Sequence, residues 1–507
     1  MMKIGANKGN DFFKQNFMGK ANILKRVVLI MPLLTLAGCE EFLSTEPDST
    51  RASINTPKQV SQLLTTAYPQ AGYLVFSEGM SDNVADKGTG TDDKTNRFSF
   101  LFEEVEATVD EQDSPDSYWA ECYRAVSVAN EALSIISKTT DPAQYNAQRG
   151  EALLARAYAH FMLVNFFSKF YDPAQPNSDP GIPYVTEPED IVIKKYERKT
   201  VAYVYEMIEK DLLEGLPLIS DGTYTVPKYH FNRAAANAFA SRFYLVKKDY
   251  AKVLQYANEV FPGSSLGDNL RPWNTTYESL SPQELYNTYS RASQNANLML
   301  VETSSTYGRY VASYRYGMNF RKWQEISAGE GIIGGSASWT FPLYTQGDNN
   351  YLVPKLNEYF VRESVNAEIG FPYVMLPIFT VEEVLFNKIE ANAYLNNTAA
   401  SLSDLNLYAS KRVDNYDASK HIITANSINR FFGTSNLKNG IISTVLAFKR
   451  VEFVQEGMRW FDIQRYAMPV QHVTSTGSVI TVPANDPRRV LQIPQSATIS
   501  GIAQNSR

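Results

Sequence analysis

Two stretches of the chain combine aromatic rings with planar polar side chains, the residue types that bind small polar ligands. The first is the loop 82–87, which contains Asp82, Asn83 and Asp86. The second contains the remaining candidate ligand-binding residues: Trp273, Tyr277, Tyr316, Asn319, Trp323, Trp339 and Tyr344. Sugars present flat C–H faces and a rim of hydroxyls, and small-ligand sites combine apolar walls with a few placed polar groups. The two stretches therefore predict a saccharide site, with burial in the core as the alternative for each aromatic residue.

Two glycine motifs match enzyme patterns without the structural context that those patterns need. The segment Gly-Ser-Ser-Leu-Gly at 263–267 matches the nucleophile elbow of hydrolases, which requires a strand before it and a helix after it. A helical pattern and Phe261-Pro262 precede it, so we interpret it as a turn. Glycines in the segment 329–334 match a dinucleotide fingerprint, but no apolar strand precedes them and no helix follows. We interpret this second segment as a flexible loop.

Metal and acid–base chemistry also lack support in the sequence. The four histidines never lie at ligand spacing, and no pair of cysteines joins them. The adjacent acidic pairs Glu103-Glu104 and Glu382-Glu383 point in different directions if they are helical, and we interpret both pairs as solvated surface. We therefore expect no catalytic residue, no metal and no cofactor.

The first cysteine, Cys39, ends a pattern that is typical of a secretory signal. Basic residues at 20, 25 and 26 precede the apolar run 27–36 and the small pair Ala37-Gly38. The run has half of the ~20 apolar residues that a membrane-spanning helix needs. A cysteine directly after Leu-Ala-Gly resembles a bacterial lipobox, in which Cys39 becomes the lipidated, palmitate-bearing first residue of the mature chain. An ordinary signal peptide with a chance cysteine, or an internal apolar strand, is the alternative.

Composition narrows the class of partner. A net charge of −6 with both signs dispersed argues against nucleic acid, which binds to a basic stripe. With Cys39 lipidated, Cys122 alone cannot form an intramolecular disulfide, so the core must stabilise the exported chain. The helical pattern around Cys122 predicts that its thiol is buried.

Helical periodicity occurs in two blocks on either side of an irregular middle. It predicts helices over 57–69, 114–137, 147–168, 200–213, 232–245, 380–396, 402–414 and 441–467. The small-residue helix 232–245, followed by a turn and a second amphipathic helix, is typical of a tetratricopeptide pair. Periodicity fails from 261 to 376, and the polar segment 80–99 is a predicted long loop. The predicted fold is all-α, a superhelical scaffold of tetratricopeptide-like pairs in which the irregular segment forms the ligand face.

Charged residues recur at helical spacing in the segment 450–465. They lie three or four positions apart, as members of helical ion pairs do: Glu452, Glu456, Arg459, Asp462 and Arg465. We interpret them as a structural charge network rather than as ligand contacts. Trp460 in the same segment, like Trp119, is assigned to the core.

Several stretches, in order along the whole chain, together resemble the SusD/RagB family, the surface lipoproteins of Bacteroidetes nutrient-uptake systems. The strongest is RVEFVQEGMRWFDIQR at 450–465, close to the family signature R-x-E-F-x-x-E-G-x-R-W-F-D-x-x-R. Further matches are CEEFL at 39–43, EALLARAY at 151–158, GIPY at 181–184, EANAY at 390–394 and the closing Ile493-Pro494 with Gln504-Asn505.

This resemblance implies a helical binding protein, not an enzyme, that captures oligosaccharide or, less often, peptide. It also implies a partner, a SusC-like TonB-dependent transporter, over which the protein lies as a lid. The acidic pair after Cys39 resembles the export signal that carries such lipoproteins to the outer face of the outer membrane. A lipoprotein hydrolase of glycans or peptides is the alternative function.

The predicted organisation follows from the patterns and the resemblance together. A signal peptide covers 1–38 and a lipidated tether 39–55. An N-terminal SusD-like helical region covers 56–260, the loop-rich ligand face 261–376, and a C-terminal SusD/RagB helical region 377–507.

Overall fold

The computed structural model describes residues 54–189, 194–347, 349–362 and 364–507. The predicted signal peptide, Cys39 and most of the tether therefore lie outside the described residues. Residues 55–507 cluster into one compact unit.

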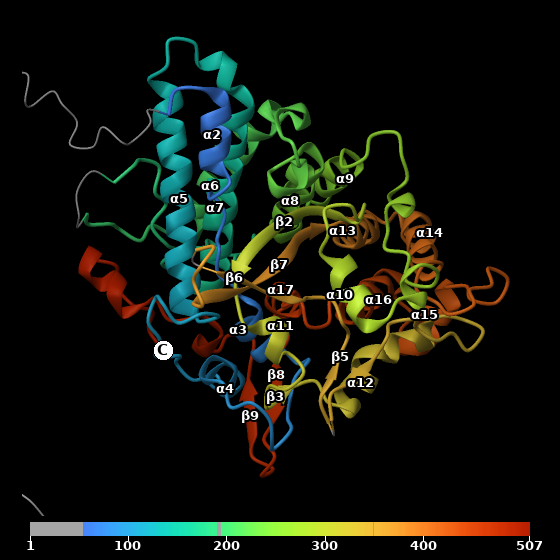
Figure 1. Cartoon of the computed structure of the whole chain (residues 1–507). Coiled ribbons are helices and arrows are strands. Elements are labelled where there is room, and N and C mark those ends of the chain that lie inside the picture. Colours follow the sequence, from blue (N-terminus) through green and yellow to red (C-terminus); the bar gives the residue numbers. More distant parts are fainter. Residues whose placement is uncertain (1–53, 190–193, 348, 363) are drawn as a thin grey trace, which may run out of the picture. The chain divides into compact units, whose positions relative to one another are not determined.

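The first helical block consists of four helices that pack beside one another (Figure 1). Their bounds are α2 Pro57–Leu64, α5 Pro115–Ser137, α6 Asn146–Phe167 and α7 Val201–Gly215. Three of them begin at a hydroxyl side chain that accepts a backbone N–H of the first turn: Thr56, Ser114 and Thr200. Helix α6 is buried almost all round, because its many alanines let α5 and α7 approach it from two sides.

The second helical block is centred on α13. Its helices are α8 Arg233–Val246, α9 Tyr250–Asn258, α13 Val381–Tyr394, α14 Thr398–Ala409, α15 Ala425–Phe432, α16 Leu437–Glu452 and α17 Arg459–Arg465. Helix α13 packs against α8, α9, α14 and α16, and α8 and α9 form the antiparallel pair that the sequence predicted. The predicted helix-rich, tetratricopeptide-like fold class is confirmed.

The predicted single helix over 441–467 is wrong in its middle. Helix α16 ends at Glu452 and α17 begins only at Arg459. Between them Gln455 and Gly457 adopt positive φ angles of 64° and 70°, which a right-handed helix does not contain. The turn aims consecutive side chains at different neighbours, so Glu456 bonds to Lys355 rather than to Arg459.

The middle segment is more regular than its sequence suggested. Strand β7 (Gly370–Thr380) pairs antiparallel with β2 (Asn297–Ser304) on one side and β6 (Glu358–Arg362) on the other. Strand β2 lacks the alternation of a half-exposed strand, because residues 297–301 are all buried. In Figure 1 this sheet lies beside α8 and α13, and both helices contact β7.

Short elements complete the described chain. The helices are α3 Leu74–Gly79, α4 Lys94–Leu101, α10 Pro282–Tyr289, α11 Tyr307–Tyr310 and α12 Phe320–Ser327. Three two-stranded sheets are β1 (Ala85–Asp86) with β3 (Tyr316–Gly317), β4 (Tyr344–Thr345) with β5 (Tyr351–Leu352), and β8 (Val470–Val473) with β9 (Val479–Val482). In the described ranges, none of the helices has both the length and the apolar character that a bilayer crossing needs.

The structure agrees with the prediction for the first glycine motif and differs from the prediction for the second. The 263–267 segment is a turn, as predicted, in which the Ser265 hydroxyl accepts a hydrogen bond from Gly267 N. The 329–334 segment is not an open loop but includes a 3-10 helix at Ala328–Ile332. It is packed: a Cβ at Gly334 would lie 2.6 Å from the Lys420 carbonyl oxygen.

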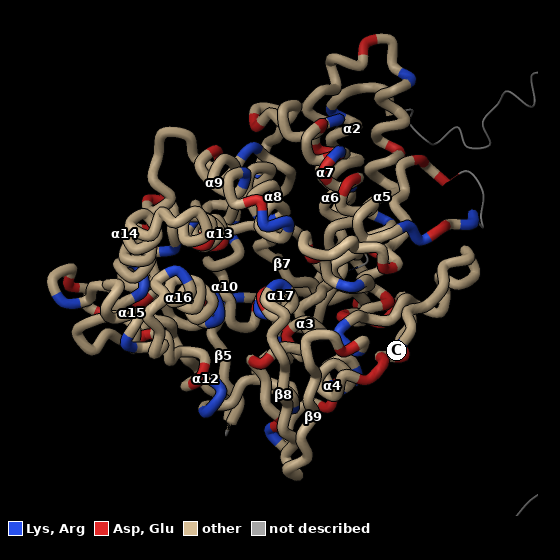
Figure 2. Tube along the Cα trace, turned by 180° about the vertical axis from the view of Figure 1, so that it is seen from behind, with Lys and Arg blue, Asp and Glu red and all other residues tan. Residues whose placement is uncertain are grey.

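Charges of both signs are interspersed along the trace, and Figure 2 shows no continuous basic stripe over the described residues. The side chains assigned to the core are buried, with exposed fractions of 6% for Trp119, 1% for Trp460 and 0% for Cys122. Those three assignments are confirmed.

Candidate functional site

The structure brings the two predicted ligand-binding stretches together. Strand β1 of the 82–87 loop pairs with β3 of the middle segment, so Asp86 lies opposite Tyr316. The Asp86 carboxylate accepts hydrogen bonds from Arg315 Nε at 2.8 Å and from Ser475 N at 2.9 Å. Three regions distant in sequence therefore meet at the Asp86 carboxylate, and these hydrogen bonds hold the loop 82–87 in position.

Asp82 and Asn83 are occupied by the protein itself. Both oxygens of Asp82 accept hydrogen bonds from Arg459, at 2.7 and 2.8 Å. Asn83 is buried, with its amide oxygen 2.9 Å from Arg450 Nε and its amide nitrogen donating to Glu78. Burial alone would raise the pKa of the Asp82 carboxyl, but Arg459 and Arg450 hold that pKa well below its usual range. These two side chains hold the loop in position, and their hydrogen-bonding groups are used by the protein instead of being available to a ligand.

Four of the predicted aromatic residues follow the alternative of burial. Their exposed fractions are 0% for Trp273, 2% for Tyr277, 5% for Tyr316 and 8% for Trp339. Trp273 packs edge-on against Tyr277, and Tyr316 stacks on Phe100 with ring centroids 4.4 Å apart. A ring without exposed surface offers no face to a sugar, so the structure removes these four from the candidate site. The physical reason is that each ring packs against other rings in the core: Tyr316 on Phe100 of α4, and Trp339 on Phe448 of α16.

The remaining aromatic residues gather on α12 and the adjacent hairpin. Phe320 is 50% exposed, and its ring centroid lies 5.8 Å from that of Tyr351 on β5. Trp323, one turn after Phe320, and Tyr344 on β4 are half-buried. We call Phe320, Trp323 and Tyr351 the aromatic face; Figure 1 shows α12 beside β5. Tyr344 lies opposite Leu352 in the β4–β5 pair, so its side chain points to the other side of this hairpin from that of Tyr351. Phe320 and Tyr351 were not predicted, although the spacing Asn-Phe-x-x-Trp at a helix start was a usable signal.

Polar groups border the aromatic face. Asn319 caps α12 by accepting a hydrogen bond from Lys322 N at 2.8 Å, so its side-chain oxygen serves the helix. Lys322 pairs with Glu325 at 2.7 Å. Asn350, next to Tyr351, accepts a hydrogen bond from Lys87 at 2.6 Å. Burial lowers the pKa of Lys87 to about 8. Cations here are paired or hydrogen-bonded, which favours a neutral ligand over an ionic one.

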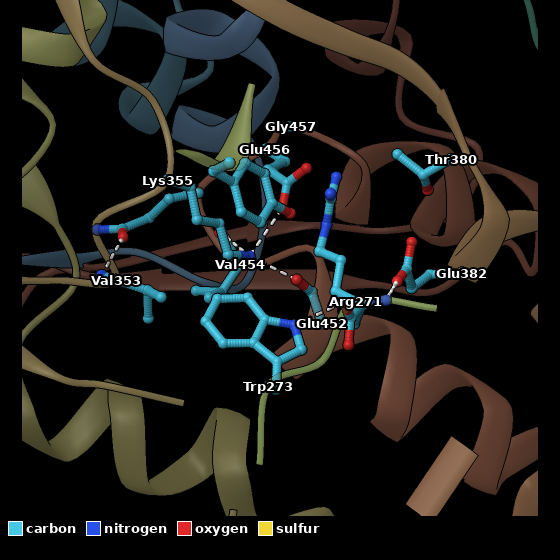
Figure 3. A network of polar contacts seen from close by, with 12 residues as sticks. Arg271, Trp273, Val353, Lys355, Thr380, Glu382, Glu452, Val454, Glu456 and Gly457 are labelled. Atoms are coloured by element: carbon cyan, nitrogen blue, oxygen red, sulfur yellow. Dashed lines mark hydrogen bonds and ion pairs between the residues drawn. The ribbon is translucent and has the colours of Figure 1, made fainter. Parts of the chain in front are cut away.

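A buried charge network lies beneath the 450–465 motif (Figure 3). Glu452 accepts a hydrogen bond from Arg412 Nε at 2.6 Å, and Trp273 Nε1 lies 3.4 Å from the same carboxylate. Lys355 Nζ lies 2.7 Å from Glu456. Arg412, Glu452 and Lys355 are almost wholly buried. The interpretation of the motif as a structural network is supported. The predicted helical pair of Asp462 and Arg465 forms within α17 at 3.5 Å, whereas Glu452 and Glu456 bond to residues of other elements.

The interpretation of Glu382 and Glu383 as solvated surface is wrong. Both side chains are buried in the first turn of α13, with exposed fractions of 0% and 4%. Glu382 pairs with Arg412 at 3.0 Å. Glu383 accepts hydrogen bonds from two nitrogens of Arg242, each at 2.5 Å. An acidic pair at a helix start is compatible with burial because the helix N-terminus and the arginines compensate both charges.

Two histidines contact backbone carbonyl groups, and His230 lies 2.7 Å from the Glu151 carboxylate. His160 Nδ1 lies 2.8 Å from the Arg156 carbonyl oxygen, and His472 lies between the carbonyl oxygens of Phe100 and Ser81. Over the described ranges, no group of three His, Cys, Asp or Glu side chains is placed to hold a metal ion.

Glu78 gives a pH-dependent prediction. This buried carboxylate accepts hydrogen bonds from Gln455 N and Gly457 N, and burial raises its pKa from 4.5 to about 7. A raised folded-state pKa means that the contribution to stability is complete below the unfolded-state value and is lost as the pH rises through about 7. Relative to wild type, we therefore expect Glu78→Gln to gain about 1–3 kcal/mol of unfolding free energy between about pH 5 and about pH 8.

Urea denaturation of both proteins at the two pH values measures this gain. An equal difference between variant and wild type at both values would show that Glu78 titrates normally.

Comparison with known proteins adds the family context. Residues 41–245 match the sequence model of the SusD-like family described as "starch-binding associating with outer membrane". Among curated proteins, none matches the chain.

Solved structures of similar fold cover nearly the whole chain. A SusD superfamily protein from Bacteroides vulgatus aligns over 89% of this chain and 99% of its own, with 17% identity and a TM-score of 0.63. A SusD-like carbohydrate-binding protein from the same organism covers 88% and 96%, with 16% identity and a TM-score of 0.61. A laminarin-binding SusD-like protein covers 89% and 99%, with 16% identity and a TM-score of 0.58. At these identities the likeness shows the fold.

Proposed function

We propose that this chain, whose residues 41–245 match the SusD-like family model described as "starch-binding associating with outer membrane", captures a neutral oligosaccharide on the aromatic face and passes it to a SusC-like TonB-dependent transporter. The protein acts by binding, without cleaving its ligand. Its place is the outer face of the outer membrane, where Cys39 carries the lipid anchor.

The half-exposed Phe320 beside Trp323 and Tyr351 is the observation that carries this proposal. An exposed aromatic cluster of this kind, rimmed by amide and paired charged groups, matches the apolar C–H face and hydroxyl rim of a sugar ring. Support for the rings comes from α16, against which α12 packs. The loop 82–87 is in turn held to the 450–465 motif by Asp82, Asn83, Arg450 and Arg459. Pre-organised rings lose little conformational freedom on binding.

The proposed ligand class rests on the family description and on the border of the aromatic face, where the charged groups are paired. The family description names starch, and one protein of similar fold binds laminarin. Both polymers are made of glucose and carry no charge. We therefore propose a glucose-based oligosaccharide for this chain.

Isothermal titration tests the proposal with maltoheptaose, laminarihexaose and a neutral peptide of similar length. Binding of a glucan, with no product after long incubation, is the expected result. Binding of the peptide alone would identify a peptide-binding member of the family. Shortened sugars that appear during incubation would establish the alternative, a glycan hydrolase.

Cys39→Ser tests the lipid anchor. Several acyl chains, at ~0.8 kcal/mol per buried CH₂, hold a protein on a membrane firmly. In the expressing bacterium we expect wild type to fractionate with the outer membrane and to incorporate radioactive palmitate, and Cys39→Ser to do neither. Cys122→Ser is the matched control, since Cys122 is buried in α5 and should leave labelling unchanged. Equal labelling of wild type and Cys39→Ser would disprove the anchor.

A further inference from the structure

A second hollow lies apart from the aromatic face. It is a cavity of about 720 Å³, within the ~300–1,000 Å³ range of small-molecule sites. Its walls come from the segment after α6, the α8–α9 turn, α13, α17 and the last residues of the chain. Helix α12 and strand β5, which carry the aromatic face, contribute none of its lining residues.

Four tyrosines give this cavity an aromatic lining: Tyr171, Tyr250, Tyr394 and Tyr466. Tyr250 and Tyr394 stack in parallel, with ring centroids 4.0 Å apart and planes 6° from parallel. Tyr171 stacks on Tyr205 behind it at 4.3 Å. All four lining rings are half-buried, so each keeps part of its surface accessible to solvent.

Charges in the walls are satisfied by the protein. Glu390 accepts two hydrogen bonds from Arg465, at 2.7 and 3.0 Å, and one from the Tyr466 hydroxyl at 2.7 Å. Lys248 pairs with Asp172 at 3.0 Å, and Lys169 pairs with Asp179 at 3.2 Å.

Two lining arginines have backbone partners instead of carboxylates. Arg198 donates to the carbonyl oxygens of Gly181, Pro180 and Ala503 and to the side chain of Asn505. Arg489 donates to carbonyl oxygens and to Gln464. Their N–H groups are therefore engaged, and neither arginine presents the open fork that grips a phosphate or carboxylate.

Some polar groups of the lining remain available. The Tyr171 hydroxyl, the Asn485 amide and the Ser506 hydroxyl make no hydrogen bond to another residue in the described part of the chain. Stacked rings, satisfied charges and free hydroxyl and amide groups together match a ligand with apolar faces and many hydroxyls, but no charge.

We propose that this cavity is a second saccharide site, which takes a neutral di- or trisaccharide independently of the aromatic face. The inference goes beyond the proposed function, because the cavity shares no lining residue with that face. A chain with both sites could hold two segments of one glycan.

Titration with maltotriose tests the second site in wild type and in three variants. Phe320→Ala/Trp323→Ala removes the aromatic face, Tyr394→Ala opens the tyrosine stack, and Ser506→Trp fills the cavity from an exposed position without deleting a core contact. We expect two sites in wild type and one in the face variant. We also expect the remaining site to weaken at least tenfold when Tyr394→Ala or Ser506→Trp is added to the face variant.

The outcomes separate the two proposals. Binding that only the face substitutions abolish would overturn the cavity site and leave the proposed function intact. Binding that only Ser506→Trp and Tyr394→Ala abolish would support the cavity and overturn the aromatic face. Saturable binding of inorganic phosphate, lost in Ser506→Trp, would overturn the assignment to a neutral saccharide.

Discussion

Arg412→Met is expected to lose about 3–5 kcal/mol of unfolding free energy, the largest effect of any single substitution considered for this protein. Arg412 has no exposed surface and donates to Glu452 at 2.6 Å and to Glu382 at 3.0 Å. Without the guanidinium, both carboxylates stay buried with less compensation. Burial raises the pKa of Glu382 even with Arg412 in place. Chemical denaturation monitored by tryptophan fluorescence measures the loss.

Arg97→Met is the matched control. Its guanidinium pairs with Asp92 at 2.8 Å, but both side chains are more than one third exposed. Exposed ion pairs contribute about 0–1 kcal/mol, so this variant should unfold at nearly the same denaturant concentration as wild type. Similar losses in the two variants would mean that water reaches the network around Arg412.

Phe320→Ala/Trp323→Ala is expected to raise the Kd for maltoheptaose at least tenfold, which corresponds to about 1.4 kcal/mol or more of binding free energy. The two rings make up most of the α12 side of the aromatic face, and aromatic anchors dominate the energy of many binding sites. Stability should change little, because Phe320 is half exposed and Ile326 is the buried apolar side chain of α12. Isothermal titration gives the Kd, and thermal unfolding checks the fold.

Phe360→Ala provides the control for this experiment. Phe360 is 52% exposed, against 50% for Phe320, but it lies on β6 rather than on α12. We expect it to bind maltoheptaose as wild type does. A loss of affinity equal to that of the double variant would show that exposed phenylalanines matter only in a non-specific way, and an unchanged Kd in the double variant would move the ligand elsewhere.

The long helices could be predicted from sequence because their causes are local. Capping residues such as Ser114 and Thr200, and apolar positions at helical spacing, act over one or two turns. The break between α16 and α17 escaped prediction because charge spacing continues through it. Only the contacts of Glu456 with Lys355, and of Glu78 with Gly457, reveal why the chain turns there.

The candidate site was harder to predict, because the sequence does not show whether an aromatic side chain is buried or exposed. Trp273 and Trp323 both lie in the segment without helical periodicity. Trp273 is nevertheless buried in the charge network, whereas Trp323 is half-buried on α12. The tyrosine cavity combines residues from widely separated segments, from Lys169 to Ser506, so no spacing within the sequence could have indicated it.

The sequence by itself determined the helical class and the family resemblance, because these depend on residues close together in the chain. Tertiary structure alone decided which aromatic rings face solvent and which carboxylates are buried. Those outcomes depend on packing between residues as far apart as Asn83 and Arg450, whose contact no local pattern encodes.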